Sequence, residues 1–373
     1  VPSIVGVLML YALILVGNAY PIELDGLAQA LGVEQTRNVW VVLLFAYTFV
    51  ATRLPVWLLL QPRDYINSHQ LFIALGVIGL GLIVGMNTIA APVVNDTPEG
   101  SPSFFPFLFI TIACGAISGF HSLVSSGTTS KQLDKETDSR FVGYLGSFGE
   151  GALALVTIIA VSAGFASLAD WEAMYTSFGE GGVRAFVHGG GNILATLGLP
   201  LAFAQTLLTV MAVLFAGTTM DAGVRLQRYI VQEWGVIYNI TPLQNGYVAT
   251  AVAVGACLTL AFGAGGADGS GGMIIWPLFG TTNQLLAGLT LLVISLMLVK
   301  KGRPSRYTLT PMIFVTSMAF LSALYQLWDL YTTGNYFLVF IDMLIITAAV
   351  LVGLEAASAL VRERRVAKTA PAA

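Results

Sequence analysis

The chain has 373 residues, of which 56% are hydrophobic and only 10% are Asp, Glu, Lys or Arg, and its mean hydropathy is +0.80. Soluble domains carry about 25% charged residues, so this composition excludes an ordinary soluble protein. The net charge is −3, and the basic residues are spread over short loops, which excludes a basic nucleic-acid-binding face. Continuous apolar stretches of about 20 residues fit a bilayer of about 30 Å and favour helices over a barrel. We predict an all-α polytopic membrane protein.

Hydropathy predicts about ten transmembrane helices. In chain order, their centres lie near Leu13, Phe49, Gly79, Ile112, Val156, Val210, Ala253, Leu289, Phe320 and Ala348. Fourteen of the 17 Lys and Arg residues fall on one side of this alternating topology. By the positive-inside rule that side is cytoplasmic, so we expect both ends of the chain to be cytoplasmic. Residues 1–361 form the predicted transmembrane domain, and residues 362–373 form a short basic tail.

Two connections and the chain's start have features of their own. The connection from Asp170 to Pro200 is long and half apolar, which indicates an interfacial or partly re-entrant helix. The stretch DAGVRLQRYIVQEWG from Asp221 has one basic and one apolar face, which favours a helix on the cytoplasmic surface. The pattern GLIVG at Gly81–Gly85 lets helices approach closely. The chain begins with Val and has no signal peptide pattern, so we expect that an N-terminal portion is missing.

Residues 118–132, SGFHSLVSSGTTSKQ, place a histidine and many hydroxyl groups at the end of a long apolar run. Glycine, Ser and Thr weaken a helix, so the sequence predicts an interruption between about Ser122 and Thr129. Transporters bind substrates and ions at such breaks. The candidate substrate-binding residues here are His121, Ser122, Ser125, Ser126, Gly127, Thr128 and Thr129. The alternative is a continuous helix whose hydroxyls bond back to their own turn.

The imidazole of His121 suits proton exchange near neutral pH, and an ionisable residue at membrane depth indicates function. A satisfied, hydrogen-bonded core histidine is the alternative. Protonated His121 would attract an anionic substrate, so the two would bind cooperatively.

Two further polar features in predicted spans offer candidate residues for ion coupling. The stretch FAGTTMDAG offers Thr218, Thr219 and Asp221 as ligands for a hard cation or as a proton relay. Asp221 could instead cap the following helix. Glu150 is a second carboxylate for ion coupling, unless it extends to water at the cytoplasmic end.

Amides at Asn283 and Gln284, in WPLFGTTNQLLAG, must face other helices because unpaired amides are costly in lipid. They are either substrate ligands or contacts that hold helices together. The three histidines are too scattered for a metal site, and no enzyme motif is present. The sequence therefore predicts no enzyme, no metal and no cofactor.

Four long blocks resemble the carbon-starvation (CstA) family of peptide and pyruvate transporters. They are LPVWLLLQPRDY (Leu54–Tyr65), HSLVSSGTTSKQ (His121–Gln132), AGTTMDAGVRLQRYI (Ala216–Ile230) and WPLFGTTNQLLAGL (Trp276–Leu289). The resemblance implies uptake of pyruvate or short peptides across the bacterial inner membrane, with proton symport. Members of the family are longer at the N-terminus, where a glycine-rich stretch with paired histidines is expected.

The resemblance also implies a LeuT-type inverted-repeat fold, of the amino acid–polyamine–organocation class. In that registration the His121 span is the broken core helix six, the Thr218 span is core helix eight, and the first core helices are missing. We expect a secondary transporter of a small carboxylate-bearing nutrient, coupled to a proton or sodium. The alternative is a membrane sensor or accessory subunit that binds the same ligand without moving it.

Overall fold

The computed structural model describes residues 2–94, 101–176, 178–264 and 271–369, and this part of the chain is helical with no strand. The chain forms two compact units. The first unit comprises Val1–Ser101 with Lys135–Leu258, and the second comprises Pro102–Asp134 with Thr259–Ala373. Each unit is therefore built from segments that are distant in sequence.

The helices of the first unit are α1 (Pro2–Ala19), α2 (Asp25–Ala30), α3 (Thr36–Ala51), α4 (Leu60–Gly85), α7 (Asp138–Ala163), α8 (Leu168–Met174), α9 (Phe178–Ala195), α10 (Leu201–Ile237), α11 (Thr241–Gln244) and most of α12 (Gly246–Gly263). The second unit contains α5 (Phe104–Ala116), α6 (Gly119–Gly127), the 3-10 helix η1 (Thr129–Gln132), α13 (Gly271–Ile274), α14 (Trp276–Lys300), α15 (Arg306–Thr332) and α16 (Tyr336–Thr369).

Every predicted span coincides with helical structure. Within the described residues, eight segments are long and apolar enough to cross a membrane, namely α4, α5 to η1 taken together, α7, α10, α12, α14, α15 and α16. The other two predicted spans correspond to shorter apolar helices, Ile4–Ala19 and Thr36–Ala51. The predicted fold class, an all-helical polytopic membrane protein, is confirmed. The predicted tail begins inside a helix, because α16 runs to Thr369, and residues 370–373 lie outside the described part.

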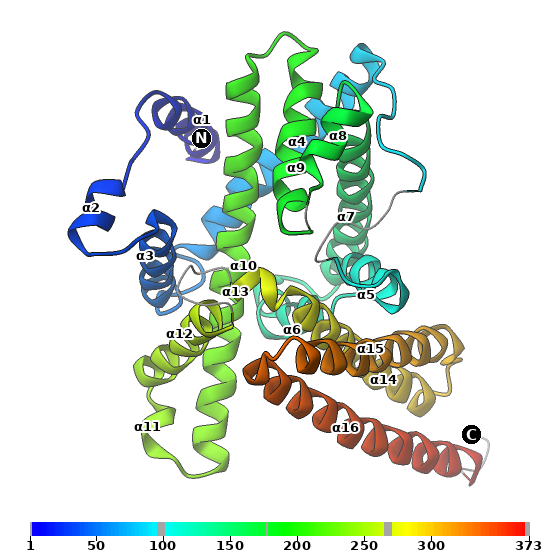
Figure 1. Ribbon diagram of the computed structural model, residues 1–373. Helices are drawn as coiled ribbons and strands as arrows, with labels where there is room; N and C mark the ends of the chain where they lie inside the picture. The colour runs from blue at the N-terminus through cyan, green and yellow to red at the C-terminus, as the bar shows by residue number, and fades with distance from the viewer. Residues whose placement is uncertain (1, 95–100, 177, 265–270, 370–373) are drawn as a thin grey trace. The chain divides into compact units, whose positions relative to one another are not determined.

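In the first unit, α4, α7, α9 and α10 pack together around a buried apolar core (Figure 1). The close approach predicted from GLIVG occurs between α4 and α9. A Cβ on Gly81 would lie 2.7 Å from the Ile193 carbonyl oxygen, and Thr196 Oγ1 donates to the Gly81 carbonyl at 3.2 Å. Ile193 is fully buried, so α9, which lies in the Asp170–Pro200 connection, is part of the unit's core.

The helix α10 is continuous for 37 residues and passes through Asp221 without a break (Figure 1). The prediction of a separate surface helix from Asp221 is therefore wrong. Its basic residues explain the difference, because Arg225 and Arg228 are only 3% and 8% exposed and face protein rather than solvent. A helix of this length spans about 55 Å, which exceeds the hydrocarbon thickness of about 30 Å.

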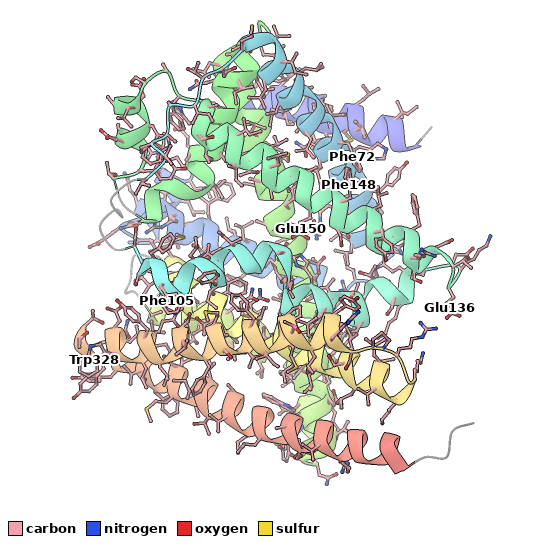
Figure 2. All side chains as sticks on the ribbon, turned by 90° about the vertical axis from the view of Figure 1, so that its right-hand side faces the viewer. Phe72, Phe105, Glu136, Phe148, Glu150 and Trp328 are labelled. Carbon is pink, nitrogen blue, oxygen red and sulfur yellow. The ribbon has the colours of Figure 1, made fainter. Side chains whose placement is uncertain are left out.

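In the second unit, α14, α15 and α16 lie side by side and α5 packs against α14 and α15. Figure 2 shows Phe105 at the start of α5 and Trp328 near the end of α15. The α14–α15 hairpin is held by a hydrogen bond of 2.7 Å between the Ser295 and Thr308 hydroxyls. At Gly288, an added Cβ would overlap Thr316, so a small residue is needed for this close approach.

Candidate functional site

The helical run around His121 is interrupted at two places, and one of them lies inside the predicted interval. Helix α5 ends at Ala116 and α6 begins at Gly119, with Ser118 in an extended conformation (φ −106°, ψ 126°) between them. Helix α6 then continues to Gly127. This first break lies before the predicted interval of about Ser122 to Thr129, whereas a second break, at Thr128, lies inside that interval. The helical geometry is lost again only at Thr128 (φ −129°, ψ −58°), before η1.

The serines of α6 fit a helix because their hydroxyls bond to carbonyls of their own turn. Ser122 Oγ donates to the Gly119 carbonyl at 2.6 Å, and Ser125 Oγ donates to the Ser122 carbonyl at 3.0 Å. Ser126 Oγ donates to the Leu123 carbonyl at 3.1 Å. This is the alternative that the sequence left open, and it explains why hydroxyls did not break the helix here.

The start of α6 is held by Asn283 of α14, and we call this arrangement the α6 cap. Asn283 Oδ1 accepts the Phe120 backbone N–H at 2.8 Å and the Ser118 hydroxyl at 3.3 Å. Asn283 Nδ2 donates to Cys114 Sγ at 3.1 Å. Since Asn283 is only 2% exposed, it satisfies backbone groups that the break would otherwise leave unpaired at membrane depth.

Close packing supports the α6 cap. A Cβ on Gly119 would overlap Leu286 and the Asn283 carbonyl oxygen, and would lie 2.6 Å from the Ala287 nitrogen. Ser122 Oγ also lies 2.7 Å from Thr290 Oγ1. Only glycine at position 119 lets α6 start this close to α14.

The remaining α6-region candidates differ in their surroundings. His121 is exposed, and its ring meets the Phe120 ring edge-on at 6.2 Å. The Thr128 hydroxyl and both amide atoms of Gln284 are buried and have no hydrogen-bond partner within the described residues. Thr129 begins η1. At the helix break, the Asn283 side chain makes polar contacts, whereas His121 contributes its backbone N–H, which donates to Ser118 Oγ at 3.4 Å.

In the first unit, Asp221 lies at the centre of what we call the charged cluster, formed by Arg63, Asp64, Asn67, Thr218, Asp221 and Arg225. Asp221 is fully buried, with its two carboxylate oxygens 3.2 Å from Arg63 Nη2 and 3.5 Å from Arg225 Nη2. Arg225 also donates to the Leu54 and Ala51 carbonyls at 3.0 and 3.1 Å. Asp221 is thus an ion-pair partner in mid-helix, and the alternative that it caps a helix is wrong.

Thr218 connects α10 to two polar residues of α4. Asn67 Nδ2 donates to Thr218 Oγ1 at 3.1 Å and to the Leu214 carbonyl at 3.4 Å. The Thr218 side chain also lies near the Asp64 carboxylate, whose Oδ1 is buried without a partner in the described chain. Thr218 therefore lies between the amide of Asn67, which it binds, and the carboxylate of Asp64.

In the structure, the charged cluster contains three residues that the sequence did not single out, Arg63, Asp64 and Asn67. Two of the predicted ion-coupling residues lie outside the cluster. Thr219 is exposed on α10, and Glu150 is exposed on α7, where Figure 2 labels it. The missed residues had a signal in the sequence, since PRDYIN opens a predicted span with two charges and an amide in its first turns. No group of three or more potential His, Cys, Asp or Glu metal ligands occurs within the described residues.

The chain matches the family described as Carbon starvation protein CstA over residues 1–177 and 162–323. The chain belongs to this family. Its relatives include the peptide transporter CstA of Helicobacter pylori (strain ATCC 700392 / 26695), which is 32% identical over 86% of this chain and 54% of the relative.

Two relatives come from Escherichia coli (strain K12). The peptide transporter CstA is 33% identical, over 70% of this CstA-family chain and 45% of the relative. The pyruvate/proton symporter BtsT is 31% identical, over 70% of this chain and 46% of the relative. The chain thus spans about half the length of the curated relatives it matches. No solved structure matches the chain.

Proposed function

We propose that this chain is part of a secondary transporter that imports a small carboxylate-bearing nutrient, pyruvate or a short peptide, by proton symport. The charged cluster is the observation that carries the proposal. It brings together an arginine and an aspartate from each of the spans α4 and α10. Ionisable groups in membrane spans are costly, and they mark ion or proton pathways.

The charges of the cluster explain how a proton would be coupled to movement. When Asp64 and Asp221 are both ionised, their two negative charges balance the two positive charges of Arg63 and Arg225. A proton on Asp64 leaves two guanidinium groups facing one carboxylate, so the packed arrangement of α4 and α10 loses stability. An uncompensated buried charge costs several kcal/mol, and about 5.5 kcal/mol shifts a two-state equilibrium from 1:99 to 99:1.

We place the substrate contacts at the α6 cap and the residues that follow it. His121 is exposed beside the α6 cap, and on protonation it gains a positive charge that would attract a carboxylate. The names of the relatives support the two substrate classes, peptides and pyruvate. The distribution of basic residues supports a bacterial inner-membrane protein with both ends of this chain cytoplasmic.

The test is uptake of labelled pyruvate and of a labelled dipeptide into proteoliposomes that contain the full-length protein, with and without an inward proton gradient. We expect one substrate to accumulate above its external concentration only with the gradient. Accumulation driven by a sodium gradient instead would contradict proton coupling. Binding without uptake of either substrate would favour a sensor or accessory subunit.

A further inference from the structure

Helix α16 carries one buried carboxylate. Asp342 is 0% exposed, whereas its neighbours Phe340, Met343 and Leu344 are 61%, 53% and 55% exposed. Both carboxylate oxygens lack a hydrogen-bond partner within the described residues. Asp342 therefore points into the protein from a helix whose other side chains here largely point outward.

The neighbouring helix α15 places a buried amide at the same level. Helices α15 and α16 form an antiparallel hairpin, in which the Tyr331 and Tyr336 rings lie 6.3 Å apart. Gln326 lies five residues before Tyr331, and Asp342 lies six residues after Tyr336. With a rise of 1.5 Å per residue, the two side chains start within about 1.5 Å of one level along the hairpin.

Gln326 has no other partner in the described chain. It is 5% exposed, and both of its amide atoms are buried without a hydrogen bond. Ser322, one turn earlier on the same face of α15, is fully buried and also unpaired. Helices α15 and α16 thus carry buried polar groups without a partner in the described chain, near one level of the hairpin, although such groups are costly to bury.

No described cation faces Asp342 from the helices packed around it. Helix α14 has no Asp, Glu, His, Lys or Arg from Trp276 to Val299, and α13 has none either. On α15, Asp329 is exposed, and Tyr325 turns its ring to Phe107 at 5.7 Å. The buried neighbours of this region are apolar, including Leu278 and Leu338. An ionised Asp342 would be an unpaired buried charge, which costs several kcal/mol.

We propose that Asp342 is a proton-binding site of the second unit, paired with Gln326. A protonated carboxyl has one O–H donor and one carbonyl acceptor, and a primary amide has the complementary acceptor and donor. In the proposed pair, which needs the two side chains to turn toward one another, the Asp342 O–H would donate to Gln326 Oε1 and Gln326 Nε2 would donate to the Asp342 carbonyl oxygen. Two hydrogen bonds then satisfy groups that are otherwise unpaired, and no buried charge remains.

The proton, rather than a metal cation, fits this pair. A bound cation needs several oxygen ligands, whereas the level of Asp342 offers one carboxylate and one amide oxygen. The site is separate from the charged cluster, which belongs to the first unit. The protonation of Asp342 does not rest on the proposed function.

The experiment is infrared spectroscopy of the full-length protein in lipid bilayers, without substrate. We expect a carbonyl-stretch band of a protonated carboxylic acid at neutral pH, lost in Asp342→Asn. The matched control is Glu355→Gln, which alters an exposed carboxylate on the same helix and should keep the band. A band that persists unchanged in Asp342→Asn would overturn the proposal.

Two further variants keep the test decisive if Asp342→Asn does not fold. Asp342→Glu should retain the band at a changed frequency. A band at the wild-type frequency in this variant would belong to another carboxylic acid and would overturn the proposal. Gln326→Leu removes the partner and should raise the band's frequency, because a carbonyl without a hydrogen bond vibrates faster. An unchanged frequency overturns the pairing. If the wild-type band is lost when sodium chloride is added, the site binds a cation rather than a proton, and the proposal is overturned.

The outcome is independent of transport. If the band is present but no substrate accumulates, the proton site stands and the proposed function fails. If the wild-type protein accumulates substrate but shows no such band, this inference fails and the proposed function stands.

Discussion

The Arg63 guanidinium of α4 lies 3.2 Å from the Asp221 carboxylate of α10, across 158 residues of sequence. The Arg63 side chain is 14% exposed and the Asp221 side chain is fully buried. This ion pair therefore links two membrane-spanning helices inside the protein, where solvent screening is weak.

Asp221→Asn should destabilise the first unit, because both Arg63 and Arg225 lose their carboxylate. Removing one partner of a buried ion pair costs about 3–5 kcal/mol. We expect a lower midpoint of thermal unfolding in detergent, measured against Glu136→Gln, an exposed carboxylate labelled in Figure 2. Equal midpoints for the two variants would show that the pair adds nothing to stability.

Asp64→Asn should separate coupling from transport. The asparagine resembles a permanently protonated Asp64, so the cluster is held in one charge state and can no longer gain or lose a proton at this position. We expect substrate exchange between equal concentrations to continue, while accumulation driven by a proton gradient falls at least tenfold. Normal gradient-driven accumulation would remove Asp64 from the coupling mechanism.

Gly119→Ala should disturb the α6 cap, since its Cβ would overlap Leu286 and the Asn283 carbonyl oxygen. Overpacking of this kind costs about 1–3 kcal/mol. Gly115→Ala is the matched control, because a Cβ there has nothing within 4 Å. We expect only the change at position 119 to lower the unfolding midpoint, and the same loss in both variants would contradict the close packing.

Asn283→Leu should leave the Phe120 backbone N–H and the Ser118 hydroxyl without their acceptor. An unsatisfied buried group costs about 1–3 kcal/mol. We expect faster hydrogen–deuterium exchange over residues 117–121 than in wild type, with exchange in α10 unchanged. If residues 117–121 remain as protected as before, Asn283 does not hold the helix start.

The number and type of the helices could be predicted from the sequence because each span is a long apolar run with its own hydropathy peak. The exact break near His121 could not. Ser122, Ser125 and Ser126 can either disrupt a helix or bond to its carbonyls, and the sequence does not say which. The break at Ile117 and Ser118 depends on Asn283, which is 165 residues from Ser118.

Only part of the charged cluster could be predicted from the sequence, for a similar reason. Thr218 and Asp221 stood out because they interrupt an apolar stretch. Arg63 and Asp64 lie at the start of a span, where charges usually face water, so their burial depends on the packing of α4 against α10. Composition around Asp221 suggested a surface helix, whereas tertiary contacts from Ala51 and Leu54 bury Arg225 instead.

The uninterrupted course of α10 has a mechanical consequence. The helix contains no proline and no break, so we expect it to move as one rigid segment. The contact between Arg63 and Asp221 lies near the middle of this segment. About 24 Å of helix lies between Asp221 and Ile237 at 1.5 Å per residue. A tilt of about 5° around Asp221 therefore moves the far end of the helix by about 2 Å. A change of one charge in the cluster that tilts α10 would thus also displace its end next to α11.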